Sequence, residues 1–226
     1  MHCELRIEIM AFFYYLIKII FFIPGKILFP VKVVNKKSFP KDRRIILIAN
    51  HLSWWDIVIL GASLPGFRRY LAKKELGKGF LSRLFLGALG GIFIDREKPD
   101  ISAIRKVKNV LDKGRGIAIF PEGTRNKEDD SLQEIKGGAV MFALQNKAPL
   151  VVASIHHKTK PFRKNYIYID ENPLKFDEEK RANVKNIADG TEELQQKMLD
   201  AKIKIDEWVA SKKDEKTLDD KNQDNN

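Results

Sequence analysis

Short apolar runs alternate with helical patterns along the middle of the chain, and this alternation constrains the fold more than any other feature of the sequence. The runs have the length of buried strands and lie at residues 45–49, 91–94, 117–120, 150–155 and 166–169. Patterns with helical spacing begin near residue 54 and occupy residues 101–113, 138–145 and 189–210. Strands that alternate with helices predict an α/β domain with a central mixed or largely parallel sheet flanked by helices.

The N-terminal region has a different character. Residues 10–23 are apolar apart from Lys18, but these 14 residues are too few for a helix that spans a bilayer, which needs about 20. Pro24 and Gly25 interrupt the run, and the mixed apolar and basic residues that follow are typical of a helix in the membrane interface. We therefore expect a membrane-associated segment over residues 1–35, an enzymatic or binding domain over residues 36–211, and a disordered charged tail over residues 212–226.

The charge of the chain indicates an anionic partner. The 226 residues carry a formal net charge of +11, and basic residues concentrate after the apolar run, at Lys32, Lys36, Lys37, Lys41, Arg43 and Arg44. Such a cluster is typical of proteins that bind anionic membrane lipids. A second basic stretch, residues 68–83, leaves open a peripheral membrane module or one that binds RNA. Cys3 is the only cysteine, so we expect no disulfide and a location at the cytoplasmic face of the membrane.

Polar residues follow three of the predicted strands, where the functional residues of an α/β sheet gather. After the first strand the sequence reads NHLSWWD over residues 50–56. Ser53 and Asp56 have the spacing of a capping box at the start of a helix. A carboxylate folded back toward the loop can also reach His51 and hold the imidazole in one tautomer, so that its other nitrogen accepts a proton.

The other two strands end in segments that suit phosphate binding. Residues 90–96 read GGIFIDR and place Arg96 at the end of a strand, and residues 120–126 read FPEGTRN and contain Glu122, Gly123 and Arg125. A guanidinium is a permanently charged, planar group that fits a phosphate. The glycine at position 123 allows a backbone amide to face a ligand.

Together these segments resemble the glycerolipid acyltransferase family, in particular its bacterial 1-acyl-sn-glycerol-3-phosphate (lysophosphatidate) acyltransferases. The resemblance rests on the blocks NHxSxxD, GxFIDR, FPEGTR and the Pro-containing strand APLVV, in that order, and on LAKKEL over residues 71–76. Two features depart from the family pattern. Ile135 precedes Lys136 and Gly137 where the family often has phenylalanine, and the loop after Asn126 is acidic.

The resemblance implies a reaction and a role for each residue. His51 is expected to be the general base and Asp56 the group that orients it. Arg96, Arg125 and either Lys73 or Lys74 are expected to bind the acceptor phosphate, with Glu122, Gly123 and Thr124 lining the acceptor and thioester site. The expected reaction transfers a fatty acyl group from acyl-CoA or acyl carrier protein to the sn-2 hydroxyl of lysophosphatidate and gives phosphatidic acid. It needs no metal or cofactor, and no nucleic acid is expected to bind.

Other readings of the same residues are weaker. Another lysolipid or glycerol-3-phosphate is an alternative acceptor. A serine hydrolase needs a nucleophile elbow, and no G-x-S-x-G occurs in the sequence. Residues 61–66 have the glycine spacing of a P-loop without its lysine, and His156 and His157 are expected to be exposed loop residues rather than metal ligands. An amide in place of Asp56 is expected to harm activity nearly as much as loss of His51, because it can favour the wrong tautomer.

Overall fold

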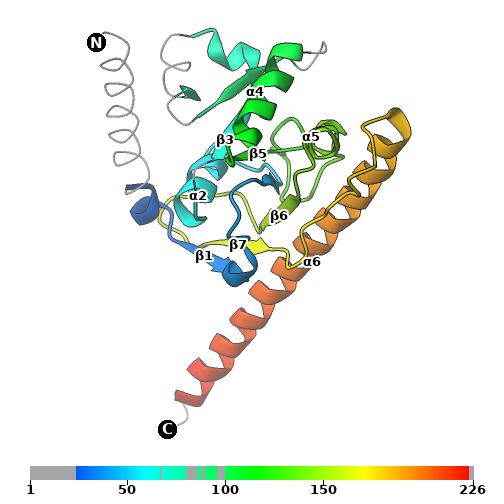
Figure 1. The fold of residues 1–226 in the computed structure, drawn as a ribbon. Helices are drawn as coiled ribbons and strands as arrows, with labels where there is room; N and C mark the ends of the chain where they lie inside the picture. The colour runs from blue at the N-terminus through cyan, green and yellow to red at the C-terminus, as the bar shows by residue number, and fades with distance from the viewer. Residues whose placement is uncertain (1–23, 67, 80–85, 88–89, 96–99, 224–226) are drawn as a thin grey trace.

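The computed structural model describes residues 24–66, 68–79, 86–87, 90–95 and 100–223, which form a sheet with helices on both faces (Figure 1). Most of the predicted membrane-associated segment, and Arg96, lie outside the described residues. Within the described part, no helix combines the length and the apolar composition that crossing a membrane requires.

Seven strands of the described residues form one sheet in the order β1-β7-β6-β2-β5-β3-β4. Their bounds are β1 Val31–Val34, β2 Ile46–Ala49, β3 Arg68–Lys73, β4 Ile92–Ile94, β5 Gly116–Ile119, β6 Leu150–Ile155 and β7 Asn165–Ile169. All neighbouring pairs are parallel except β6 and β7, which are antiparallel. The prediction of an α/β domain with a mixed, largely parallel sheet is confirmed.

The central strand β2 is buried on both faces, and its side chains alternate between two apolar clusters. Ile46 and Ile48 enter one cluster with the helices α4 (Ile101–Asp112), α5 (Gly138–Asn146) and α6 (Val184–Gln223). Leu47 and Ala49 enter the other with α2 (Asp56–Ser63) and Phe29. This double coverage explains why β2 reads as a continuous apolar run.

Two strands were not predicted. Residues 31–34 were assigned to an interfacial helix, which is wrong for them, because β1 pairs in parallel with β7 at the edge of the sheet. Strand β3 lies in the basic stretch of residues 68–83, for which the sequence predicts no strand, but its backbone pairs with both β5 and β4. Basic residues at both ends of β3 hid its short apolar centre, Tyr70 to Ala72, which is buried.

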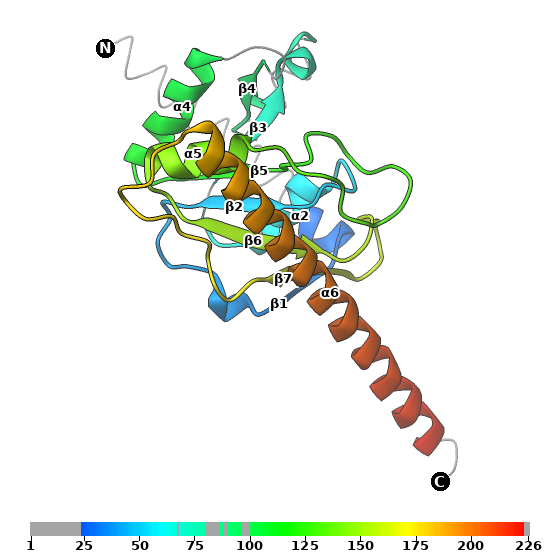
Figure 2. The same cartoon turned by 90° about the vertical axis from the view of Figure 1, so that its right-hand side faces the viewer.

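The C-terminal region also differs from the prediction. The last helix was expected over residues 189–210 with a disordered tail from residue 212, but α6 begins at Val184 and continues to Gln223. Its final turns extend beyond the sheet (Figures 1 and 2). The apolar stripe that α6 buries ends at Val209, and beyond it pairs of opposite charge one turn apart, such as Lys212 with Glu215, stabilise the helix. A search for apolar periodicity cannot detect this part of the helix.

Candidate active site

The predicted site residues meet at the carboxyl ends of β2 and β5, which are neighbours in the sheet. The loop after β2 carries His51, and the loop after β5 carries Phe120 and Glu122. The rings of His51 and Phe120 stack, with their centroids 4.0 Å apart and their planes 16° apart. Asn50 fixes the start of the first loop, because its side-chain amide both donates to and accepts from the backbone of Ile155 at the end of β6.

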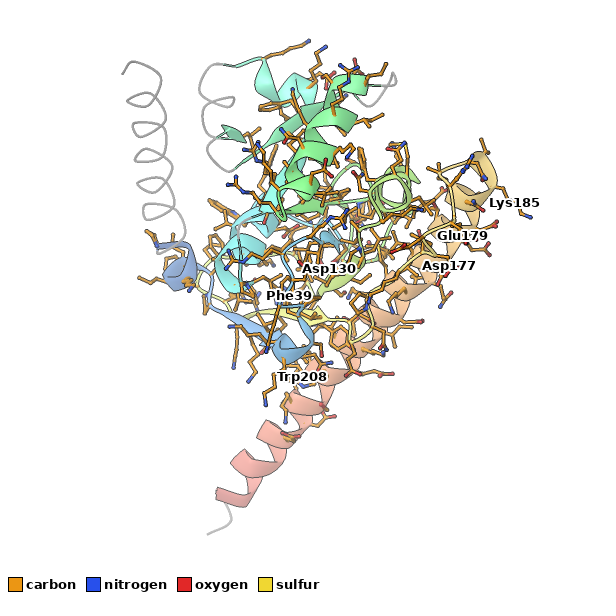
Figure 3. All side chains as sticks on the ribbon, viewed as in Figure 1. Phe39, Asp130, Asp177, Glu179, Lys185 and Trp208 are labelled. Atoms are coloured by element: carbon orange, nitrogen blue, oxygen red, sulfur yellow. The ribbon has the colours of Figure 1, made fainter. Side chains whose placement is uncertain are left out.

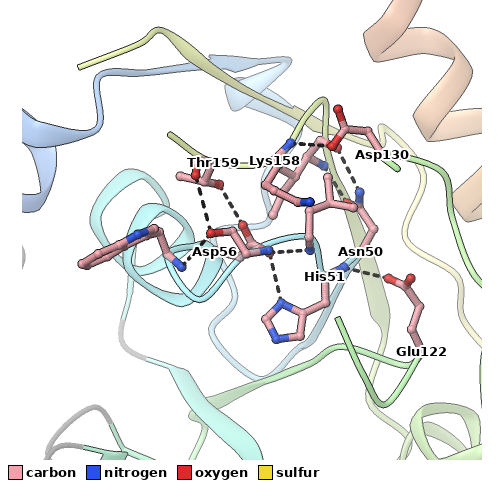
Figure 4. A network of polar contacts seen from close by, with 11 residues as sticks. Asn50, His51, Asp56, Glu122, Asp130, Lys158 and Thr159 are labelled. Carbon is pink, nitrogen blue, oxygen red and sulfur yellow. Dashed lines mark hydrogen bonds and ion pairs between the residues drawn. The ribbon is translucent and has the colours of Figure 1, made fainter. Parts of the chain in front are cut away.

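His51 pairs with Asp56 as the spacing predicted. The distance from His51 Nδ1 to Asp56 Oδ2 is 3.0 Å, and this contact is drawn in Figure 4. The His51 side chain is 15% exposed, whereas that of Asp56 is fully buried. A carboxylate at Nδ1 favours the tautomer that carries its proton there, which leaves Nε2 as the nitrogen that can accept a proton from a substrate.

The carboxylate of Asp56 is held by four donors. Oδ2 accepts the backbone N–H groups of Leu52 and Ser53, both at 2.7 Å, as well as the contact from His51. Oδ1 accepts the hydroxyl of Thr159 at 2.7 Å. A buried carboxylate with this many donors is fixed in position and can fix the imidazole in turn.

The capping arrangement at the start of α2 resembles the predicted one, although the helix begins at Asp56 rather than near residue 54. The Ser53 hydroxyl accepts the N–H of Trp55 at 3.3 Å, and the Asp56 carboxylate accepts the N–H of Ser53. The bond from Ser53 to the Asp56 carboxylate is one of the two that a capping box provides, whereas the Ser53 hydroxyl binds the N–H two residues on rather than three. Ser53 therefore has a structural partner of its own beside the pair of His51 and Asp56.

Glu122 supports the backbone of the site. Its side chain is 3% exposed; Oε1 accepts the N–H of His51 at 2.7 Å, and Oε2 accepts the N–H of Gln133 at 3.1 Å. Burial raises the pKa of Glu122 from 4.5 to about 7, against the lowering effect of these two backbone donors, and the nearby charge of Asp56 raises the pKa further. The sequence predicted a residue that lines the substrate site, whereas both carboxylate oxygens of Glu122 bind protein backbone.

The loop after Glu122 brings an arginine to the edge of the site. Gly123 has a φ of +76°, a conformation that favours glycine, and the backbone N–H of Asn126 donates to the carbonyl of His51 at 2.8 Å. Between them Thr124 is exposed, and the Arg125 guanidinium lies over the ring of Trp54, 3.8 Å from its centroid. Stacking on an aromatic face leaves the in-plane donors of a guanidinium available for an anion.

The two candidate lysines lie at the same edge of the sheet. Lys73 is the last residue of β3, the neighbour of β5, and Lys74 begins a short 3₁₀ helix, Lys74–Gly77. The Lys73 ammonium lies 3.7 Å from the Glu75 carboxylate, and both side chains are about half exposed. The structure thus brings His51, Asp56, Glu122, Arg125 and Lys73 to one edge, whereas the position of Arg96 lies outside the described residues.

Thr159 is the part of the site that the sequence did not reveal. It lies in the connection between β6 and β7, is 3% exposed, and reaches Asp56 across 103 positions of sequence. No local pattern marks a threonine for such a contact. The same connection is tied to the acidic loop after β5, because the N–H of Lys158 donates to Asp130 at 2.8 Å, as Figure 4 shows.

The prediction that His156 and His157 are exposed loop residues is wrong for His156. His156 is not an exposed loop residue, because its Nδ1 lies 2.7 Å from Asp206 of α6, and Lys202 donates to that carboxylate as well. Burial lowers the pKa of His156. Among the described residues, no group of three or more histidine, cysteine or acidic side chains is placed to hold a metal ion.

Comparison with known proteins identifies the family. A sequence model of the acyltransferase family matches residues 30–156, more than half of the chain and the whole region from β1 to β6. The chain belongs to the acyltransferase family. Its matched region contains His51, Asp56, Glu122 and Arg125.

Several relatives of this acyltransferase share the same named activity. The 1-acyl-sn-glycerol-3-phosphate acyltransferase of Bacillus subtilis is 40% identical over 125 residues, which are 55% of this chain and 61% of the relative. That of Streptococcus pneumoniae is 37% identical over 123 residues, which are 52% of this chain and 44% of the relative. The chain thus spans less than two thirds of the length of these two relatives.

A solved structure supports the fold assignment. The crystal structure of a 1-acyl-sn-glycerophosphate (LPA) acyltransferase from Thermotoga maritima superimposes with a TM-score of 0.59 and 27% identity. The match covers 80% of this chain and 72% of the other. The structural match therefore extends well beyond residues 30–156, the region that the family model matches.

Proposed function

We propose that this member of the acyltransferase family transfers a fatty acyl group from a thioester to the sn-2 hydroxyl of 1-acylglycerol-3-phosphate and so forms phosphatidic acid. The observation that carries the proposal is the buried carboxylate of Asp56, 3.0 Å from Nδ1 of the partly buried His51 ring, at a sheet edge that also presents Arg125. The names of the relatives from Bacillus subtilis and Streptococcus pneumoniae support the choice of acceptor.

The chemistry follows from the state of His51. An alcohol is a poor nucleophile at neutral pH, so Nε2 takes the hydroxyl proton as the oxygen attacks the thioester carbonyl carbon. The tetrahedral intermediate then breaks its carbon–sulfur bond, and the departing sulfur takes the proton back from the imidazolium. Asp56 stabilises the imidazolium between these two steps. General-base catalysis of this kind is worth roughly 10²–10⁴ in rate.

Direct attack by the acceptor fits the surroundings of His51. Ser53 is the nearby hydroxyl that a covalent mechanism would need, but its oxygen accepts a backbone N–H and lies 3.5 Å from the carbonyl of Thr159. The single cysteine, Cys3, precedes the family region. We therefore propose a ternary complex of donor, acceptor and protein rather than an acyl-protein intermediate.

Cations around the site would hold the acceptor phosphate. Arg125 presents its guanidinium edge beside Trp54, and Lys73 lies at the end of the strand next to β5. Arg96 is also proposed to bind the acceptor phosphate, and this role is inferred from its sequence motif. Phosphate binding converts affinity into orientation, because it places the sn-2 hydroxyl against Nε2 of His51.

The proposed partners are an anionic membrane surface, the lysophosphatidate acceptor, and acyl-CoA or acyl carrier protein as donor, with no cofactor. The location proposed is the cytoplasmic face of a membrane, reached through the apolar N-terminal run and the basic residues after it.

One experiment tests the acceptor and the donor together. Purified protein is given a mixed panel of acceptors (lysophosphatidate, other lysolipids and glycerol-3-phosphate) with acyl-CoA or acyl carrier protein donors, and the lipids formed are identified by mass spectrometry. Phosphatidic acid that forms with wild type and not with His51→Ala supports the proposal. Acylation of a different acceptor contradicts the choice of lysophosphatidate. Salt-sensitive RNA binding without any acyl transfer would support the basic-module reading instead.

A further inference from the structure

The connection between β6 and β7 exposes an aromatic side chain at its tip. Phe162 is 78% exposed and has a φ of +56°. This left-handed conformation is unfavourable for a residue with a bulky side chain, and a large apolar group in water gains nothing from folding. Lys160, Pro161, Arg163 and Lys164 around it are exposed as well. A strained and exposed phenylalanine points to a role outside the folding of the domain.

Asn165 holds this tip in place. The asparagine is 1% exposed, its Oδ1 accepts the N–H of Lys160 at 3.2 Å, and its Nδ2 donates to the carbonyl of Arg163 at 2.8 Å. The N–H of Phe162 donates to the carbonyl of Leu28 at 2.6 Å. Hydrogen bonds therefore tie both ends of the tip and its centre to the body of the domain, and they hold Phe162 in its exposed position.

The exposed apolar residues next to Phe162 belong to other parts of the chain. Ile27, one residue before Leu28, is 73% exposed, and Phe29, one residue after, packs against Trp55 with ring centroids 4.8 Å apart. Trp55 and its neighbour Trp54 are 45% and 53% exposed. We call Ile27, Trp54, Trp55 and Phe162 the docking band. The short helical segment at residues 24–28 and the β6–β7 connection lie side by side in Figures 1 and 2.

The charge at the tip of the docking band is basic, whereas the acidic loop at residues 128–130 is tied to the start of the same connection through Lys158. Lys26, Lys160, Arg163 and Lys164 are exposed beside the docking band, and the sequence has no acidic residue over residues 24–41 or 156–168. Tryptophan and phenylalanine flanked by lysine and arginine are the residues that proteins place at the interface of a bilayer. An apolar tip flanked by basic residues complements the head groups and acyl boundary of an anionic membrane.

We infer that the docking band binds the surface of an anionic bilayer, with Phe162 at the acyl boundary and the basic residues among the head groups. The band adjoins the candidate active site on two sides. Thr159, three residues before Phe162, donates to Asp56, and Trp54 stacks with Arg125. Docking there brings His51 to the level of the lipid head groups. The inference rests on the proposed function only in taking the acceptor to be a membrane lipid.

The position of the band relative to lipid is tested with full-length Phe162→Trp and Val184→Trp. Val184, the first residue of α6, is 88% exposed; it adjoins Lys185, which Figure 3 labels at the side of the domain away from the helical segment at residues 24–28. The proteins are mixed with phosphatidylglycerol and phosphatidylcholine vesicles whose acyl chains are brominated. The fluorescence added at position 162 should be quenched, and that added at position 184 should not. Equal quenching at the two positions overturns the inference.

The contribution of the Phe162 side chain to vesicle binding is measured with Phe162→Asn, because asparagine tolerates a positive φ and removes the apolar side chain. Its midpoint of thermal unfolding should equal or exceed that of wild type, and its partition onto anionic vesicles should fall about tenfold. Arg163→Gln with Lys164→Gln should weaken binding about fivefold per residue on phosphatidylglycerol vesicles and little on phosphatidylcholine alone. Val184→Asn is the matched control and should bind like wild type.

Two outcomes separate this inference from its rivals. Self-association that Phe162→Asn abolishes, with no quenching by brominated lipid, would identify a second copy of the chain as the partner and overturn the lipid assignment. Neither measurement needs turnover. Quenching at position 162 in a protein that acylates no acceptor would therefore uphold the docking band and contradict the proposed function alone.

Discussion

Replacing Asp56 by asparagine tests how the carboxylate acts on His51. The imidazole and two backbone N–H groups all reach the same oxygen, Oδ2, while Oδ1 receives the hydroxyl of Thr159. In Asp56→Asn the amide oxygen must occupy the Oδ2 position, since an NH₂ there would face two N–H donors. The NH₂ then faces Thr159, whose hydroxyl can turn to accept. The productive tautomer of His51 is therefore kept, contrary to the expectation from the sequence.

What Asp56→Asn does lose is the negative charge. A hydrogen bond to a charged group contributes about 1.5–3 kcal/mol, and a neutral one about 0.5–1.5 kcal/mol. The difference, about 1–2 kcal/mol, acts on the imidazolium formed in the transition state. Since about 1.4 kcal/mol is tenfold in rate, kcat should fall roughly 5- to 30-fold. Asp56→Ala should do far more damage, because each buried donor left without a partner costs about 1–3 kcal/mol of stability.

The assay follows thiol release from the acyl thioester with lysophosphatidate present, and circular dichroism confirms that each variant is folded. The KM for either substrate should change little, since Asp56 does not face the substrates. Nitrogen NMR should show the neutral His51 ring still protonated at Nδ1. A fall in kcat of more than 1,000-fold in a folded Asp56→Asn protein, or a ring protonated at Nε2, would refute the reasoning.

The remaining predictions concern the neighbours of Asp56 and the acceptor site. Thr159→Val should lower kcat about tenfold with little change in KM, and Thr159→Ser should restore it; equal kcat in all three proteins would exclude a positioning role. Because burial raises the pKa of Glu122 from 4.5 to about 7, the fold favours the protonated form. The contribution of Glu122 to the stability of the fold is therefore full below pH 4.5 and is lost as pH rises to about 7. Urea titrations of Glu122→Gln should therefore show a smaller loss of stability than wild type across that range, and parallel curves would contradict the cause assigned. Arg125→Lys should raise the KM for lysophosphatidate and leave the donor KM nearly unchanged, because an ammonium cannot reproduce the planar fork; equal changes in both would remove Arg125 from the phosphate site.

The parts of the molecule that could be predicted share a local physical cause. β2, β5 and β6 are buried on both faces and therefore read as apolar runs, and the pairing of His51 with Asp56 spans one turn of chain. Strand β3 was missed because basic residues flank its buried centre. Thr159 was missed because its contact with Asp56 depends on the antiparallel return from β6 to β7, which no local pattern encodes.

The backbone role of Glu122 shows a second limit. Its motif predicts a site in the loop after β5, and in that loop the side chain turns inward to the N–H groups of His51 and Gln133. A motif fixes which loop carries a residue. Whether that residue faces the substrate or supports the loop depends on the packing of neighbouring strands.

The most direct test of the central claim is the rate of acyl transfer to lysophosphatidate by His51→Ala at saturating thioester. If Nε2 of His51 takes the proton of the acceptor hydroxyl, kcat should fall by roughly 10²–10⁴ while the donor KM stays within about twofold of wild type. A folded His51→Ala protein that keeps more than a tenth of the wild-type kcat would contradict the account.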